Sequence, residues 1–261
     1  MKPLTNRAME KKYELTDEVI RETGGDGFPA FLYRIKALRD FSCNGTSVHA
    51  GDLGGYIEGE DNLSHEGSCW VFNDAKVYDS AKVYGDACVS DSAEVSAYAE
   101  VYDQAIVSDN AVVSGLAKVY DSAKVFEMGY VIGRSDVSGE ACVLGTSTVI
   151  DSIARDSAYI TGDSYISEGA VVKGDAAIRG DAKICGDAVV EASGDFIVFH
   201  IWWSDKNERY TWTRSNNKWN GWSGPITAEE MIAKGYEDSP ASGRRYEQLV
   251  KYVNGIRTEE I

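Results

Sequence analysis

The chemistry that this sequence offers most directly lies in its three histidines, His49, His65 and His200. An imidazole titrates near neutral pH, so it can take a proton from a hydroxyl or an amine. His65 and His200 stand just outside the two ends of a regular central segment, and none of the three lies inside it. If the protein is an enzyme, we predict that His65 or His200 is its general base.

Four residues near the N-terminus are of types that bind metal ions: Cys43, His49, His65 and Cys69. Two thiolates and two imidazoles form an acceptable zinc site. Their spacing matches no familiar zinc motif, however, and Cys69 also fills a small position of the repeat described next. We therefore favour ordinary packing for these residues and expect no metal and no cofactor.

A repeat of six residues dominates the sequence between these groups. Valine recurs at every sixth position from Val71 to Val149; after a slip of one residue, the period resumes at Ile160 and ends at Val190. A small residue stands two positions before each of these aliphatic residues, which makes twenty repeats. Such a strict period is typical of a solenoid, in which each repeat stacks on its neighbours.

The spacing predicts short β-strands. A small residue and an aliphatic residue two positions apart point to the same side of a strand. The three positions that follow are rich in Gly, Asp, Asn and Ser, which favour turns. A helix is excluded, because a period of six would place successive valines on opposite sides of it.

This pattern, aliphatic-x-x-x-small-x over residues 69–192, resembles that of the hexapeptide-repeat superfamily. The resemblance implies a mainly β fold: a left-handed parallel β-helix in which three repeats close one triangular coil of 18 residues. Twenty repeats then give about seven coils, a prism about 30 Å tall. The resemblance also implies a homotrimer and, in many members, a CoA-dependent acyltransferase with a histidine base.

A second likeness comes from the segments around the repeat. Asp52–Ile57, Leu63–Gly67, Cys69–Val71 and the Trp-rich tail are similar to uncharacterised phage and prophage hexapeptide-repeat proteins. This likeness implies a protein made in a bacterial cytoplasm by a mobile element, and it implies no particular chemistry.

A coil of 18 residues places Tyr84, Tyr102 and Tyr120 in one column, where their rings should stack. Such a ladder has three interpretations: it packs against a neighbouring subunit, it holds a planar ligand such as a nucleobase, or it stabilises the sheet. We favour the subunit contact, because an exposed aromatic row is prone to stick to other molecules.

Acidic columns are expected at two turns, one formed by Asp91 and Asp109 and the other by Asp103 and Asp121. Like charges in a column repel one another, so we expect a cation or a basic partner to compensate them. The same spacing puts Cys88 and Cys142 on one face but three coils apart, about 14 Å, which is too far for a disulfide.

The flanks are predicted to cap the ends of the β-helix, whose backbone groups need partners. Residues 1–68 should form an α/β cap with a strand at Phe31–Leu38 and a turn at Gly51–Tyr56. Residues 193–261 should begin with a β-hairpin, in which Phe196–Trp203 and Tyr210–Arg214 flank a polar turn at Asp205–Glu208.

Two helices should complete the C-terminal cap. A capping box of Thr227 and Glu230 begins the first, which Gly235 should end, and the second should span roughly Gly243–Ile256. The tryptophans of this region form either a recognition surface or a plug on the last coil. They are Trp202, Trp203, Trp212, Trp219 and Trp222.

The net charge is −16, and residues 71–190 hold 19 acidic residues against 9 basic ones. This excess argues against direct nucleic-acid binding and fits either a basic protein partner or simple solubility. We expect a cytoplasmic protein without membrane contact, since no apolar run is long enough for a membrane span or a secretory signal. The five cysteines contain no CxxC pair and are predicted to be reduced thiols.

Our leading expectation is a non-enzymatic phage or prophage protein that binds inside the host, where it blocks a host protein or a defence complex. A variant of this hypothesis is a protein that sequesters a nucleotide signal between subunits, using the Tyr ladder. The alternatives are a CoA-dependent acyltransferase and a structural or assembly component of the virion.

Overall fold

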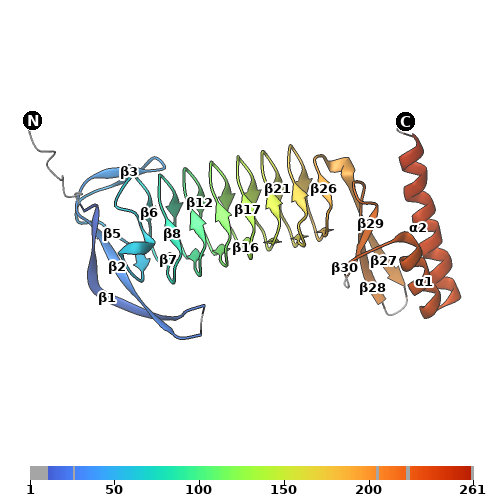
Figure 1. Cartoon of the computed structure of the whole chain (residues 1–261), viewed down its shortest axis with the longest axis horizontal. Helices are drawn as coiled ribbons and strands as arrows, with labels where there is room; N and C mark the ends of the chain where they lie inside the picture. The colour runs from blue at the N-terminus through green and yellow to red at the C-terminus, as the bar shows by residue number, and fades with distance from the viewer. Residues whose placement is uncertain (1–10, 26, 204–205, 222–223, 260–261) are drawn as a thin grey trace, which may run out of the picture.

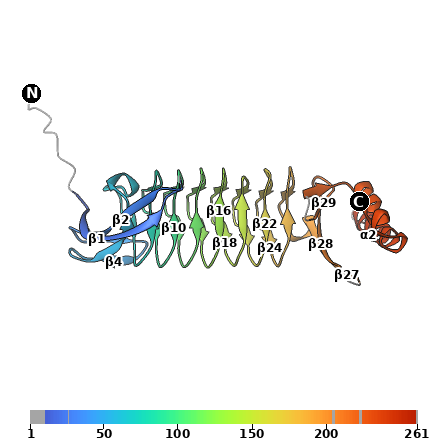
Figure 2. The ribbon, with the colours of Figure 1, turned by 90° about the horizontal axis from the view of Figure 1, so that it is seen from below.

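A computed structural model describes residues 11–259, apart from 26, 204–205 and 222–223. The molecule is a rod in which a regular stack of β-strands lies between an N-terminal β region and a C-terminal sheet with two helices (Figures 1 and 2). The stack has three faces of parallel strands, which we call the first, second and third face.

The first face contains β5 (Leu53–Ile57), β7 (Lys76–Val77), β10 (Glu94–Val95), β13 (Val112–Val113), β16 (Tyr130–Ile132), β19 (Thr148–Ile150), β22 (Tyr165–Ile166) and β25 (Lys183–Ile184). The second face contains β8 (Lys82–Val83), β11 (Glu100–Val101), β14 (Lys118–Val119), β17 (Asp136–Val137), β20 (Ile153–Ala154), β23 (Val171–Val172) and β26 (Val189–Val190). The third face contains β6 (Trp70–Val71), β9 (Cys88–Val89), β12 (Ile106–Val107), β15 (Lys124–Val125), β18 (Cys142–Val143), β21 (Tyr159–Ile160) and β24 (Ala177–Ile178).

The predicted parallel β-helix is therefore confirmed, with about 8 turns where the repeat count gave about seven. The additional turn comes from the segment expected to be part of the cap. There β5 pairs with β7, and Leu63 makes a parallel bridge to Val83. This turn lacks the Val-and-small signature, which is why the repeat pattern did not include it.

Inward packing of the aliphatic and small positions holds the stack together. Val83, Val101 and Val119 lie in successive turns in parallel register, and their side chains are buried. The small residue two positions earlier, such as Ala99, is buried as well. Backbone hydrogen bonds join each turn to the next; Lys82 N donates to Ala99 O at 2.9 Å. The predicted inward direction of both rows is confirmed.

The slip in the sequence period corresponds to one corner that is a residue shorter than the others. Val137 pairs with Ala154, and Val149 pairs with Ile166, each 17 residues further along the chain rather than 18. Ala154 thus occupies a valine position and continues the row to Val172. The rows stay aligned because the residue is lost from a corner, which lies outside the strands.

The N-terminal cap differs from the α/β mixture that the sequence led us to expect. Within residues 11–68 it is built of β-strands and one 3-10 turn, η1 (Glu60–Asn62). The hairpin of β1 (Tyr13–Thr23) and β2 (Pro29–Ala37) pairs with β5 and so extends the first face. A second hairpin, β3 (Phe41–Cys43) with β4 (Thr46–Val48), adjoins the third face, where Cys43 contacts Cys88.

The prediction of a turn across Gly51–Tyr56 is wrong for most of that segment, because Leu53–Ile57 is the strand β5. Gly54 and Gly55 do not form a turn; they allow the backbone of β5 to lie close to neighbouring segments. A Cβ atom on Gly54 would lie 2.6 Å from the carbonyl oxygen of Val71, and one on Gly55 would lie 2.5 Å from that of Ala75. Glycine at these positions lets β5 lie directly against the next turn.

The C-terminal cap contains the predicted hairpin and helices, within a sheet that is larger than expected. After the 3-10 turn η2 (Ser193–Asp195), the sheet runs in the order β27 (Phe196–Trp203), β28 (Lys206–Thr213), β29 (Lys218–Gly221) and β30 (Gly224–Ile226). Residues 206–208, predicted as part of a turn, belong to β28, and Asp205 lies outside the described residues. Helices α1 (Ala228–Asp238) and α2 (Pro240–Glu259) pack beside this sheet.

Gly235 does not end α1, which continues to Asp238. A Cβ atom on Gly235 would lie 2.2 Å from Cδ2 of Tyr246, so this glycine allows the two helices to approach closely. The predicted capping box is confirmed, since Thr227 Oγ1 accepts from Glu230 N at 3.1 Å. Neither helix within the described chain has a long enough apolar run to cross a bilayer.

The C-terminal sheet supplies hydrogen bonds to the open end of the solenoid. Lys183 N donates to Thr211 Oγ1 at 2.9 Å, and Val189 N donates to Ser215 Oγ at 2.7 Å. Two backbone donors of the last turn are thereby satisfied, which supports the prediction that this region is a cap.

The inward rows lead to a stability prediction. Val101→Ala should lower the free energy of unfolding by about 2 kcal/mol, because it removes two buried methyl groups and leaves a cavity. The exposed Lys82→Ala, on the same face, should change it by less than about 0.5 kcal/mol. Urea unfolding followed by circular dichroism measures both; equal losses in the two variants would contradict the assigned packing.

Candidate functional site

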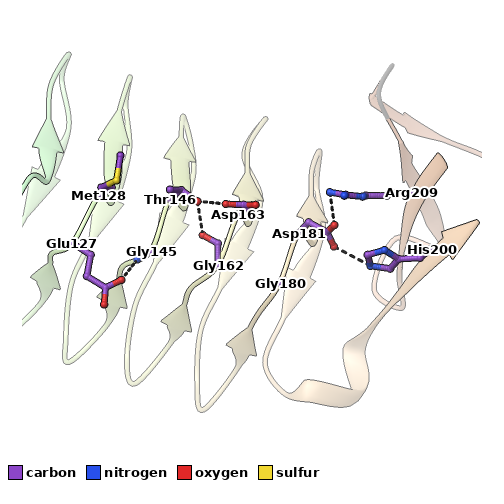
Figure 3. Close-up of a pocket in the computed structure, with 10 residues that line it drawn as sticks. All are labelled: Glu127, Met128, Gly145, Thr146, Gly162, Asp163, Gly180, Asp181, His200 and Arg209. Atoms are coloured by element: carbon purple, nitrogen blue, oxygen red, sulfur yellow. Dashed lines mark hydrogen bonds and ion pairs between the residues drawn. The ribbon is translucent and has the colours of Figure 1, made fainter. Parts of the chain in front are cut away.

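A groove of about 590 Å³ runs along one corner of the solenoid towards the C-terminal sheet (Figure 3). The three turns at its centre carry Gly145, Gly162 and Gly180 at the corner position, all with positive φ. The three preceding turns carry Asp91, Asp109 and Glu127 there, in the same left-handed conformation. The groove begins where side chains at this corner give way to glycine.

Hydrogen bonds within the groove hold its acidic side chains in place. Glu127 Oε2 accepts from Gly145 N at 2.8 Å. Thr146 Oγ1 donates to Gly162 O at 3.1 Å and also to the carboxylate of Asp163 (Figure 3). The polar side chains of these walls are therefore held by the solenoid backbone and by one another.

A cluster of three charged or titratable residues closes the far end of the groove. His200 and Arg209 are directly opposite each other in the β27–β28 pair, so both side chains leave the same face of the sheet. Both meet Asp181 in the last turn of the solenoid: His200 Nε2 lies 3.1 Å from Asp181 Oδ1, and Arg209 forms an ion pair with Oδ2 (Figure 3). The cluster therefore joins the solenoid to its cap.

The pairing with Asp181 gives His200 the orientation that a general base requires. A carboxylate bound to one imidazole nitrogen fixes the ring and leaves the other nitrogen with a lone pair. The His200 side chain remains 44% exposed, so a substrate could reach it. Of the two histidines predicted as bases, His200 is the one with this geometry.

His65 has a structural position instead. Its Nδ1 accepts the backbone N–H of Lys12 at 3.2 Å, and its ring stacks on Tyr13 with centroids 4.2 Å apart. Burial lowers the pKa of His65, while the nearby carboxylate of Glu60 opposes that shift. Because the Nδ1 lone pair is already used, His65 is poorly placed to accept a proton from a substrate.

The four candidate metal ligands do not converge. Cys43 contacts Cys88, Cys69 contacts the ammonium of Lys12, and His49 is exposed with Nδ1 3.9 Å from Asp40. No group of three or more potential ligands occurs within the part of the chain that the structure describes. Cys43 and Cys69 are fully buried, as ordinary packing requires, whereas His49 is exposed.

Lys12 is a feature that the sequence did not single out. It is fully buried, and its Nζ donates to Cys69 O at 2.7 Å and to Cys69 Sγ at 3.2 Å. Burial lowers the pKa of this lysine and raises that of the Cys69 thiol. No local pattern predicts this pair, since the two residues are 57 positions apart.

The Tyr ladder forms as predicted. Tyr84 and Tyr102 stack with centroids 4.9 Å apart, Tyr102 and Tyr120 with centroids 5.0 Å apart, and both pairs are within 1° of parallel. Burial raises the pKa of Tyr84 and of Tyr102 to about 12. Because the facing sides of neighbouring tyrosine rings stack on each other, no nucleobase fits between two of these rings.

The two acidic columns also form, and each of their carboxylates accepts a backbone amide of the next turn. Asp109 Oδ2 accepts from Glu127 N, and Asp121 Oδ2 accepts from Gly139 N, both at 3.0 Å. One turn earlier, Asp91 Oδ2 accepts from Asp109 N and Asp103 Oδ2 accepts from Asp121 N, both at 3.4 Å. The backbone amides of the next turn therefore stabilise the charged form of each carboxylate. The expectation that a cation or a basic partner compensates the columns stays a prediction.

Two of the five predicted interaction tryptophans are buried. Trp212 and Trp219 pack in the core between the C-terminal sheet and the helices, so they are not available as a recognition surface. Trp202 and Trp203 lie on β27, but their side chains are outside the described part of the chain, as is all of Trp222.

No model of a known protein family matches this chain, and no curated protein matches it significantly. The class is therefore defined by architecture: a β-solenoid protein with a β-hairpin cap at one end and a sheet-and-helix cap at the other. The resemblance to hexapeptide-repeat proteins that the repeat suggests stays a prediction.

The structural position of His65 leads to a pH prediction. Its lowered pKa means that the unfolded chain, with an ordinary pKa of 6.5, binds the proton more tightly than the folded chain. Acidification below pH 6.5 should therefore destabilise the protein until the pH reaches the lowered pKa of the folded state. In His65→Asn, whose amide oxygen can still accept the Lys12 N–H, this contribution should disappear.

Melting temperatures of the two proteins between about pH 5 and pH 8 measure the effect. As the pH falls, the melting temperature of the wild type should decrease more than that of the variant. Parallel pH profiles would contradict the assigned burial of His65.

Proposed function

We propose that this chain is a non-enzymatic binding protein whose solenoid presents ordered carboxylates to a basic partner. The observation that carries the proposal is the pair of acidic columns, Asp91 with Asp109 and Asp103 with Asp121, all exposed at corners of successive turns. Carboxylates in such a column repeat at the strand spacing of about 4.8 Å. A row of lysine or arginine side chains on a partner surface is the complementary chemistry.

The hydrogen bonds within the columns support this proposal. In Asp103, Asp109 and Asp121, Oδ2 is held by a backbone amide, and Oδ1 has no protein partner among the described residues. One oxygen of each therefore faces outward in a fixed direction. A surface that is ordered before binding loses little conformational entropy when the partner docks.

The likeness to phage and prophage hexapeptide-repeat proteins supports a more specific proposal. The partner would be a basic host protein or a defence complex in the bacterial cytoplasm, and the binding protein would act as a homotrimer. Sedimentation equilibrium of the purified chain tests the oligomeric state independently of any partner.

Charge removal that preserves the fold tests the leading proposal. Asparagine tolerates the left-handed conformation and keeps a side-chain acceptor, so Asp→Asn at 91, 103, 109 and 121 removes four charges while retaining the ladder hydrogen bonds. We expect this variant to lose at least about tenfold in retention of basic host proteins at low salt, and to lose most of the salt dependence of binding.

A matched control removes four charges elsewhere on exposed positions: Asp17→Asn, Asp61→Asn, Asp175→Asn and Glu237→Gln. The immobilised proteins are exposed to a bacterial lysate, and bound proteins are identified by mass spectrometry at low and high salt. If retention falls equally in both variants, the effect comes from net charge and not from the columns. Unchanged retention in the column variant would overturn the proposal.

A CoA-dependent acyltransferase is the second candidate, favoured by the contact between His200 and Asp181 at the end of the groove. In that function His200 would take the proton from an acceptor hydroxyl or amine as the acyl group is transferred. The groove beside it would be the place for the acyl donor.

Titration with acetyl-CoA by isothermal calorimetry separates the two functions. The acyltransferase requires saturable micromolar binding that is weakened at least about tenfold in His200→Ala and retained in His49→Ala, an exposed histidine at the other end of the molecule. The leading proposal predicts that acetyl-CoA does not bind saturably to the wild type or to either variant.

A further inference from the structure

Two cysteine sulfurs meet where the N-terminal cap lies against the solenoid. Cys43 ends β3, Cys88 stands on the outer side of β9, and their Sγ atoms are 2.7 Å apart. Cys43 is fully buried and Cys88 is 7% exposed. Both are free thiols, although they come from segments 45 residues apart.

The geometry needs little change for a covalent bond. A disulfide has its sulfurs about 2.05 Å apart, so the two Sγ atoms would have to move by less than about 1 Å. The other cysteines are not placed in this way. Cys69 Sγ accepts from Lys12 Nζ, Cys185 Sγ accepts from the hydroxyl of Ser167, and Cys142 lies three turns along the third face from Cys88.

A small oxidant can reach the pair from one side. An open cavity of about 300 Å³ lies between the β3–β4 hairpin and the third face, and Cys88 is part of its lining. Asn44 and Thr46 line it from the hairpin, and Ile106 lines it from the next turn of the solenoid. Cys43 is fully buried and does not line this cavity, so the sulfur that first meets the oxidant is that of Cys88.

We propose that Cys43 and Cys88 are a peroxide-oxidised thiol pair that closes into a disulfide. The thiolate of Cys88 attacks one oxygen of the peroxide, which breaks the O–O bond and gives a sulfenic acid and hydroxide. The sulfur of Cys43 then forms the S–S bond, and the sulfenic oxygen leaves as water. In total two thiols lose two electrons and two protons, and one hydrogen peroxide becomes two waters.

The product would clip the β3–β4 hairpin to the solenoid. The new bond closes a loop that includes β4, β5 and the first turn, so the unfolded chain loses more freedom than the folded one. The oxidised protein should therefore melt several degrees higher than the reduced protein. This inference is independent of the proposed binding function.

Alkylation after oxidation is the test. The folded protein is treated with hydrogen peroxide, quenched with catalase, unfolded and alkylated with iodoacetamide. Digestion with trypsin and with a protease that cleaves after glutamate places Cys43, Cys69 and Cys88 on three separate peptides. We expect a linked peptide pair containing Cys43 and Cys88 that disappears on reduction, together with the rise in melting temperature.

Two variants make the result specific. The link and the rise should be absent in Cys43→Ser and should persist in a Cys142→Ser, Cys185→Ser double variant, whose remaining cysteines include the pair. Circular dichroism of the reduced proteins checks that each variant folds. Recovery of Cys43 and Cys88 alkylated after oxidation, of Cys88 as an unlinked higher oxide, or of a link through Cys69 would overturn the proposal.

Discussion

The stacking of turns depends on one constraint: every turn must place an aliphatic and a small side chain inside the prism in register with the turn below. The rows through Val83, Val101 and Val119 meet this constraint with full burial, and the backbone amides of one turn then reach the carbonyls of the next. The short corner before Ala154 shows which part is essential. A residue can be lost from a corner, whereas the inward positions continue without interruption.

The corners use the same stacking for a different purpose. Their residues adopt a left-handed conformation, which glycine, aspartate and asparagine tolerate best. Where the residue is acidic, its carboxylate accepts the amide of the next turn and remains outside as a fixed negative group. Where it is glycine, as at Gly145 and Gly162, the corner is open and a groove results. Both candidate surfaces of this protein, the acidic columns and the groove, thus follow from the choice of corner residue.

The caps contribute the residues that the repeat does not contain. Thr211 and Ser215 satisfy amides at the end of the solenoid, and the same sheet carries His200 and Arg209 to Asp181. At the other end, the β3–β4 hairpin brings Cys43 to Cys88. At both junctions between solenoid and cap, residues distant in sequence therefore come together.

The repeat alone determined the solenoid, the burial of the valines, the Tyr ladder and the acidic columns. Each of these follows from a fixed period, because residues one turn apart must stack when the turn length is constant. The sequence also identified His200, since few histidines are present. Only the tertiary structure decided that Asp181 and Arg209 join His200, that Cys43 meets Cys88, that His65 is structural and that Trp212 is buried. These contacts depend on how the caps dock against the solenoid. Docking is set by packing between distant segments, and no period in the sequence records it.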